Sequence, residues 1–182
     1  LMAKEPARPS IIIEGIEAAE SDEESIEENI RSSTDLSGYE CDLPHWRLTR
    51  LGKLTQKNTE QVLRARGYYR PKIKLEIEQK QGCWNLKLAI KLGKQVLIRK
   101  LDISVSGELA DIKAYRKYKK NLPLKKGQSL NHANYEKIKT AIETLASQYG
   151  FFEGQFTRHQ LIVEPSRNAA DIDLAFDSGP RY

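Results

Sequence analysis

The sequence predicts an α+β protein of two similar units, each folded as strand, helix, helix, strand, strand. Three observations predict it. Apolar residues alternate with polar ones in several short segments, as in half-buried strands, and recur at steps of three and four in others, as in helices. The same order of segments occurs twice within 182 residues. Glycine also stands at matching places, since Gly67 and Gly150 each follow the second expected helix of a unit.

The first unit opens with a strand over 11–16, which ends near Gly15. An acidic helix is expected from about 21 to 33, and a polar stretch over 34–44 breaks the pattern. A second helix is expected from about 45 to 66. Basic residues lie near its C-terminus, where they interact favourably with the helix dipole. Its moderate apolar stripe consists of Leu51, Leu54, Val62 and Ala65.

A period of two follows in the segments 72–78 and 84–91, where apolar residues alternate with polar ones or Ala89. Each segment is therefore expected to be a strand with one buried face. The link over 79–82 is short and polar, so the two strands form an antiparallel hairpin.

The second unit starts at about Gln95 and repeats this order. Its expected segments are a strand closing at Gly107, a helix over 108–120, a loop over 121–127, a helix capped by Asn131, and strands over 156–163 and 170–176. The second of these helices has the clearest apolar stripe, which consists of Tyr135, Ile138, Ile142, Leu145 and Tyr149.

A unit of one strand, two helices and a hairpin can bury its apolar surface if both helices cover one face of a three-stranded sheet. The first and third strands then run in the same direction and the second runs opposite, so each sheet is mixed. We expect a first domain over 1–93, a second over 94–179, and the start of a third, missing domain at 180–182.

The composition, with 39% hydrophobic and 30% charged residues, is that of a protein that folds in water. The longest aliphatic run, Ile11 to Ile13, is far too short to cross a membrane, and no signal sequence is visible. His45, His132 and His159 share no catalytic spacing, and no phosphate-binding glycine loop occurs. We therefore expect no enzyme, no cofactor and no metal site.

Several motifs occur in a fixed order along the chain. These are Gly67-Tyr68-Tyr69 followed by Pro71, a Trp84 strand ending in Leu92-Gly93, Asn134-Tyr135-Glu136, Tyr149-Gly150-Phe151-Phe152, and the tail from Phe176 to Tyr182. Together they resemble the first two POTRA (polypeptide-transport-associated) domains of the TamA-like outer-membrane assembly proteins. The resemblance covers nearly all of the chain from Ile11 onward.

The resemblance implies tandem POTRA domains at the periplasmic face of the bacterial outer membrane, ahead of a β-barrel that is absent here. It also implies a role in assembling outer-membrane proteins, with client segments and a TamB-like inner-membrane protein as partners. The module would position extended polypeptide beside the barrel. Since a third POTRA domain and the barrel are missing, the chain should not carry the assembly activity alone.

The free edges of the sheets are the expected binding sites, because an extended client can complete a sheet through main-chain hydrogen bonds. The predicted partner-binding residues are Lys72, Ile73, Lys74, Leu75, Glu76 and Ile77 in the first domain and Thr157, His159, Leu161 and Val163 in the second. An alternative is that Lys72 and Lys74 only guard the edge against aggregation. A proline at position 74 would distinguish the two, provided that the N–H there points outward.

Two charged segments offer further sites. The acidic helix carries Asp22, Glu23, Glu24, Glu27 and Glu28, and is either a solvated face or a docking surface for a basic partner. The basic patch consists of Arg116, Lys117, Lys119, Lys120, Lys125 and Lys126. This patch is either a solvated helix end or a contact for anionic lipid or an acidic protein. The alternative function for the whole chain is a nucleic-acid-binding module that uses this patch, although a periplasmic protein meets little nucleic acid.

Cys41 and Cys83 are either a disulfide or two unrelated thiols. The expected topology favours the disulfide. If the first strand runs up, the first helix runs down, so the loop with Cys41 lies at the bottom; the second helix runs up and the next strand down, so the hairpin before Cys83 lies there too. We therefore predict a bond that ties the 34–44 segment to the sheet.

Overall fold

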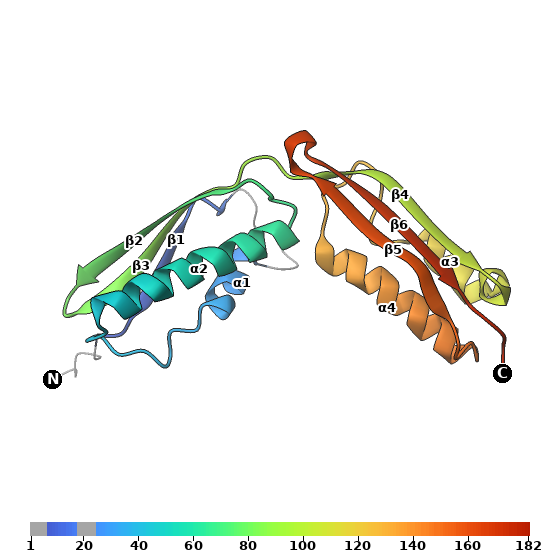
Figure 1. Cartoon of the computed structure of the whole chain (residues 1–182), viewed down its shortest axis with the longest axis horizontal. Coiled ribbons are helices and arrows are strands. Elements are labelled where there is room, and N and C mark those ends of the chain that lie inside the picture. The colour runs from blue at the N-terminus through green and yellow to red at the C-terminus, as the bar shows by residue number, and fades with distance from the viewer. Residues whose placement is uncertain (1–6, 18–24) are drawn as a thin grey trace. The chain divides into compact units, whose positions relative to one another are not determined.

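The structure is a computed structural model that describes residues 7–17 and 25–182 (Figure 1). The chain divides into two compact units, one made of residues 1–64 and 68–93 and the other of residues 65–67 and 94–182.

The first unit follows the predicted order. Its elements are β1 (Ser10–Glu14), α1 (Ile26–Ser33), α2 (His45–Ala65), β2 (Lys72–Lys80) and β3 (Cys83–Lys91). The strands form a sheet of order β1-β3-β2, in which β1 runs parallel and β2 antiparallel to β3. Figure 1 shows α1 and α2 on the same face of this sheet. The predicted mixed sheet is therefore confirmed.

The core of this unit lies between the sheet and the two helices. Every second residue of β3 is buried, and Trp84 is fully enclosed. Helix α1 contributes Ile26 and Ile30, and α2 contributes Leu48 and Leu63 among others. The apolar side chains on every second position of the strand thus pack against the apolar faces of the two helices in one layer.

The predicted apolar stripe of α2 is partly wrong. Leu51 is buried, but Leu54 is 52% exposed. The buried stripe instead includes Gly52, Thr55 and Thr59, which are small or polar residues that hydropathy alone does not mark as core. A Cβ at Gly52 would lie 2.5 Å from Leu75 Cδ2, so the glycine allows α2 to approach β2 closely.

Helix α1 begins at Ile26, later than expected, because Ser25 is extended and its side chain accepts the N–H of Glu28 as an N-cap. The expected start near position 21 and the acidic residues Asp22, Glu23 and Glu24 lie outside the described residues. Glu27 pairs with Arg31 within the helix, at 2.6 Å between Oε1 and Nη2.

The second unit consists of β4 (Leu97–Ser106), η2 (Glu108–Asp111), α3 (Lys113–Lys120), α4 (His132–Gln148), β5 (Gln155–Glu164), η3 (Pro165–Arg167) and β6 (Ala169–Asp177). Its sheet has the order β4-β6-β5, with β4 parallel and β5 antiparallel to β6. Ala170, Ile172, Leu174 and Phe176 of β6 form the buried face. The unit therefore repeats the β-α-α-β-β order and the mixed sheet of the first.

The continuous helix expected over 108–120 is wrong, since the segment breaks at the extended Ile112 into η2 and α3. Both Leu109 and Tyr115 are buried, although a separation of six residues would place their side chains about 120° apart around one uninterrupted helix. The break lets both side chains reach the core.

Helix α4 matches its prediction. The side chain of Asn131 accepts the N–H groups of Ala133 and Asn134, which confirms it as the N-cap. Tyr135, Ile138 and Ile142 of the predicted stripe are buried.

Candidate functional site: the free edges of the two sheets

The main-chain groups of the edge strand β2 alternate in direction, and the hairpin turn sets which ones face β3. Gln81 and Gly82 have φ values of 53° and 80°, so they form a two-residue turn between Lys80 and Cys83. The residues that flank such a turn exchange hydrogen bonds with each other. By alternation, Lys72, Lys74, Glu76 and Glu78 bond to β3, while the N–H and C=O groups of Ile73, Leu75 and Ile77 point away from the sheet.

Two contacts elsewhere agree with this assignment. The side-chain amide of Gln56 donates to the carbonyl oxygen of Ile73 at 3.2 Å, so that oxygen is accessible from outside the hairpin. On the other side of β3, the carbonyl oxygen of Ile90 points at Gly15, beyond the end of β1, where an added Cβ would lie 2.0 Å from it. The proline test at position 74 required an N–H that points away from the sheet. This requirement is not met, because the Lys74 N–H points toward β3.

The same reasoning locates the outward groups of β5. Ser178 N–H donates to the carbonyl of Ser106 at 3.1 Å, which sets the even-numbered residues of β6 to face β4. The odd-numbered residues then face β5 and bond to Arg158, Gln160, Ile162 and Glu164. The outward N–H and C=O groups of β5 are therefore those of His159, Leu161 and Val163, which are three of the residues named from sequence.

Thr157, the fourth residue named on β5, lies at an irregularity between Phe156 and Arg158. Its hydroxyl donates to the carbonyl of Ala175 at 3.2 Å. The regular free edge of β5 thus begins after Thr157.

The two opposite edges are partly occupied. The carbonyl of Ile11 on β1 accepts Arg31 Nη1 at 2.9 Å, and β1 is only five residues long. The start of β4 pairs with the segment 127–130, since Ile98 N–H donates to Gln128 O and Gly127 N–H donates to Ile98 O. No hydrogen bond among the described residues occupies the outward groups of Leu75 and Ile77, so β2 and β5 are the more open edges.

The side chains at these edges differ between the units. On β2, Leu75 and Ile77 are half-buried under α2, whereas Lys74 is exposed on the open face and pairs with Glu76 at 2.6 Å. On β5, His159 is exposed, while Leu161 and Val163 are half-buried. His159 thus combines an outward main-chain N–H with an exposed side chain, whose ring meets that of Phe156 edge-on at 6.4 Å between centroids.

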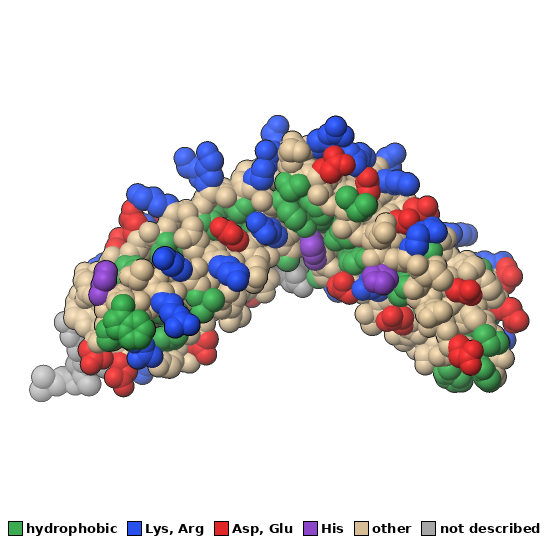
Figure 2. All heavy atoms as spheres, viewed as in Figure 1, with side chains coloured by type: hydrophobic (Ala, Val, Ile, Leu, Met, Phe, Trp, Pro, Cys, Tyr) green, Lys and Arg blue, Asp and Glu red, His purple; other side chains and the backbone are tan. Residues whose placement is uncertain are grey.

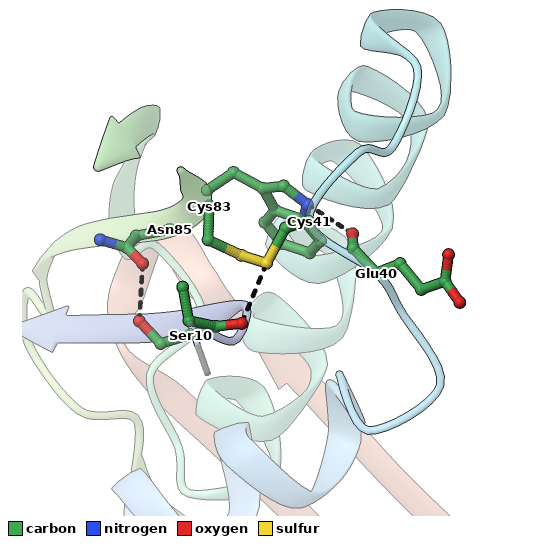
Figure 3. Close-up of a disulfide and its surroundings, with 7 residues drawn as sticks. Ser10, Glu40, Cys41, Cys83 and Asn85 are labelled. Carbon is green, nitrogen blue, oxygen red and sulfur yellow. Dashed lines mark hydrogen bonds between the residues drawn. A yellow bond between two sulfur atoms is a disulfide. The ribbon is translucent and has the colours of Figure 1, made fainter. Parts of the chain in front are cut away.

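The disulfide between Cys41 and Cys83 is confirmed, with the two Cα atoms 4.5 Å apart (Figure 3). Cys83 is buried, and the indole Nε1 of the next residue, Trp84, donates to the carbonyl of Glu40 at 3.0 Å. The ring of Tyr39 also meets Trp84 edge-on, with ring centroids 6.4 Å apart. The 34–44 segment is therefore fixed to β3 by a covalent bond, a hydrogen bond and a ring contact.

The open face of the second sheet carries an ion-pair cluster that the sequence did not reveal. Arg99 pairs with Asp171 at 2.6 Å and with Glu164 at 2.9 Å. Hydrogen bonds from the guanidinium lower the pKa of both carboxyl groups. Glu164 and Asp171 belong to one hairpin, but Arg99 is at least 65 residues away in sequence, so the β4-β6-β5 order is needed to bring it to them.

The basic patch lies at the C-terminal end of α3 and in the loop after it. Arg116 pairs with Asp111 at 2.7 Å, and Lys117, Lys119, Lys120, Lys125 and Lys126 are exposed. Three of these cations lie in the last helical turn, where they interact favourably with the negative end of the helix dipole. Lipid or acidic-partner contact at this patch stays a prediction.

The three histidines lie on three different elements. His45 and His132 each begin a helix and His159 lies on β5. Burial lowers the pKa of His132. Within residues 7–17 and 25–182, no cluster of three or more His, Cys, Asp or Glu side chains could hold a metal ion. In the same residues no helix has both the length and the apolarity to cross a membrane.

Residues 11–92, which span the first unit from β1 to the end of β3, match the family model described as "POTRA domain TamA domain 1". Among solved structures, the chain is similar to POTRA3-5 of BamA from Haemophilus influenzae, at 14% identity and a TM-score of 0.47. That match covers 96% of this chain and 66% of the other.

Two Omp85 structures from Anabaena are also similar. POTRA1-2 of the periplasmic domain matches at 8% identity and a TM-score of 0.38, with 96% of each chain covered. POTRA1-3 matches at 8% identity and a TM-score of 0.40, with 93% of this chain and 60% of the other covered. This chain thus spans less than two thirds of the length of some of the proteins it matches.

Proposed function

We propose that this chain, whose residues 11–92 match the family model of TamA POTRA domain 1, is the periplasmic arm of an outer-membrane protein assembly factor. Its two α+β units bind extended segments of outer-membrane protein clients at the free edges of β2 and β5. POTRA domains are non-catalytic, so the function is one of binding and positioning.

The observation that carries this proposal is the row of unoccupied main-chain groups along each edge. On β5 they belong to His159, Leu161 and Val163, and on β2 to Leu75 and Ile77. An added strand pairs with such groups whatever its side chains are, which suits a binder of many different clients. The opposite edges offer fewer groups, because Arg31 and the 127–130 segment already bond to them.

Three further features belong to the proposal. The disulfide favours an oxidising compartment such as the periplasm. The TamB-like inner-membrane partner and the chain's own barrel are expected neighbours in the assembled protein. Binding of clients by the two units alone would be weak, since one short added strand buries little surface.

The test uses amide hydrogen exchange on the full 182-residue chain with a synthetic peptide of about ten residues of alternating hydrophobicity, as in barrel strands. Strand addition should slow exchange at His159, Leu161 and Val163. The alternate amides of Arg158 and Gln160, which bond to β6, should not change. Uniform slowing along β5, or none at the outward amides of either edge, would reject strand addition.

A substitution in β5 gives an independent measurement. His159→Pro removes an outward N–H from an exposed position, whereas His159→Ala removes the same side chain and keeps the N–H. We expect the proline variant to bind the peptide about fivefold more weakly or worse, which corresponds to one net hydrogen bond of about 1 kcal/mol. The alanine variant should bind as the parent does. Equal binding by both variants would contradict the proposed mode at β5.

A further inference from the structure

The first unit has a hollow on the outer side of α2 that the strand-addition mode does not use. It lies between the N-terminal half of α2 and the 34–44 segment and has a volume of about 580 Å³. It is lined by Tyr39, Trp46, Arg47, Arg50, Leu51 and Leu54. On the face seen in Figure 2, hydrophobic and basic side chains lie side by side over α2.

Two large apolar side chains of this hollow are left in water. Trp46 is 65% exposed and Leu54 is 52% exposed, although the sequence pattern assigned Leu54 to the core. They are eight residues apart on α2, hence about 12 Å along the helix axis. Exposed apolar groups of this size that line one hollow are typical of a surface that a partner covers.

The charge around the hollow indicates what kind of partner fits. Neither Arg47 nor Arg50 forms an ion pair among the described residues, even though the 34–44 segment carries carboxylates. The Arg47 guanidinium lies 6.0 Å from the centroid of the Trp46 ring. Over its whole length α2 carries five Lys or Arg residues and one acidic residue, Glu60. Two unpaired guanidinium groups beside apolar surface favour a ligand that carries carboxylates.

The far wall of the hollow is held in place before any ligand arrives. Tyr39 supplies this wall, and it is fixed by its ring contact with Trp84. Two residues further on, Cys41 is bonded to Cys83, and between them the carbonyl of Glu40 accepts the Trp84 indole (Figure 3). A preformed wall reduces the ordering that binding would otherwise require.

We propose that this hollow binds an acidic polypeptide segment that inserts two apolar side chains, one against Trp46 and one against Leu54, and pairs its carboxylates with Arg47 and Arg50. Recognition here is by side chains, so it is separate from main-chain pairing at β2 or β5. A concave site suits a peptide better than a lipid surface, because a flat surface would contact only the rim.

The test uses the oxidised 182-residue chain and a synthetic peptide rich in Asp and Glu that carries two leucines four residues apart, which is about 13 Å in an extended chain. A lysine-rich version of the same peptide is the control. The two tryptophans of the chain serve as reporters in an NMR titration. The indole N–H signal of Trp46 should shift saturably with the acidic peptide and not with the basic one. The signal of Trp84, which is buried, should move much less.

Paired variants separate this site from general charge attraction. Arg47→Glu with Arg50→Glu should weaken binding of the labelled acidic peptide by about tenfold or more. Lys53→Glu with Lys57→Glu makes the same change in net charge on exposed residues of the same helix outside the hollow, and should change binding by about twofold or less. Trp46→Ala should weaken binding while leaving the charge unchanged.

Three results would overturn the proposal. The first is no Trp46 shift at about 1 mM acidic peptide. The second is equal weakening by the two double charge variants, which would indicate diffuse attraction. The third is binding of vesicles of phosphatidylglycerol and phosphatidylethanolamine that both double variants reduce equally, with no response to the peptide, which would indicate a membrane-facing helix. His159→Pro should leave the Trp46 response unchanged, so failure here is distinguishable from failure of strand addition.

Discussion

Loss of the Cys41–Cys83 bond should destabilise the first unit and leave the second unchanged. The bond joins residues separated by 42 positions. Chain-entropy estimates for a loop of this length give about 4 kcal/mol, and measured losses for native disulfides are about 2–5 kcal/mol. For a unit of this size, a loss of 2–4 kcal/mol corresponds to a fall in melting temperature of about 8–30 °C.

The assay follows from where the tryptophans lie. Both Trp46 and Trp84 are in the first unit, so tryptophan fluorescence reports on its unfolding alone, while circular dichroism follows both units. The double variant Cys41→Ala with Cys83→Ala should melt earlier by fluorescence, and reduction of the parent should match it. The melting transition of the cysteine-free second unit serves as the internal control. Equal fluorescence melting points for oxidised and reduced parent would refute the reasoning, as would an equal fall in both units.

Two further predictions test particular contacts. Gly15 has a φ of +92°, and an added Cβ would lie 2.0 Å from a carbonyl oxygen of β3. Gly15→Ala should therefore lower the free energy of unfolding, measured with denaturant, by more than about 1 kcal/mol. Gly38→Ala is the control and should be nearly neutral, because the space around Gly38 is open. The pKa values of Asp171 and Glu164 are lowered from their ordinary values of 3.8 and 4.5. The ion pairs of these carboxylates therefore stabilise the second unit fully above those ordinary pKa values, and the stabilisation is lost as the pH falls through the lowered pKa values. Acid unfolding monitored by circular dichroism should therefore show a smaller pH dependence in Arg99→Ala, and an unchanged dependence would count against the ion-pair cluster.

The sequence by itself determined the order of elements in both units. Strict alternation in 72–78 and 84–91 and the regular stripe of α4 leave little choice of secondary structure, because each period buries one face. The order strand, helix, helix, hairpin then places the 34–44 loop and the β2–β3 turn at the same end. That is why the Cys41–Cys83 bond could be predicted from chain direction alone.

Only the tertiary structure decided which side chains and main-chain groups are left for a partner. Leu54 fits a helical stripe in the sequence, but small and polar residues such as Gly52 and Thr55 take the buried positions because α2 packs closely over β2, and Leu54 remains in water. The direction of the Lys74 N–H depends on the register of β2 against β3, which a two-residue turn sets and composition does not. Likewise, the pairing of Arg99 with Asp171 needs the strand order, since hydropathy patterns carry no information on which strands become neighbours.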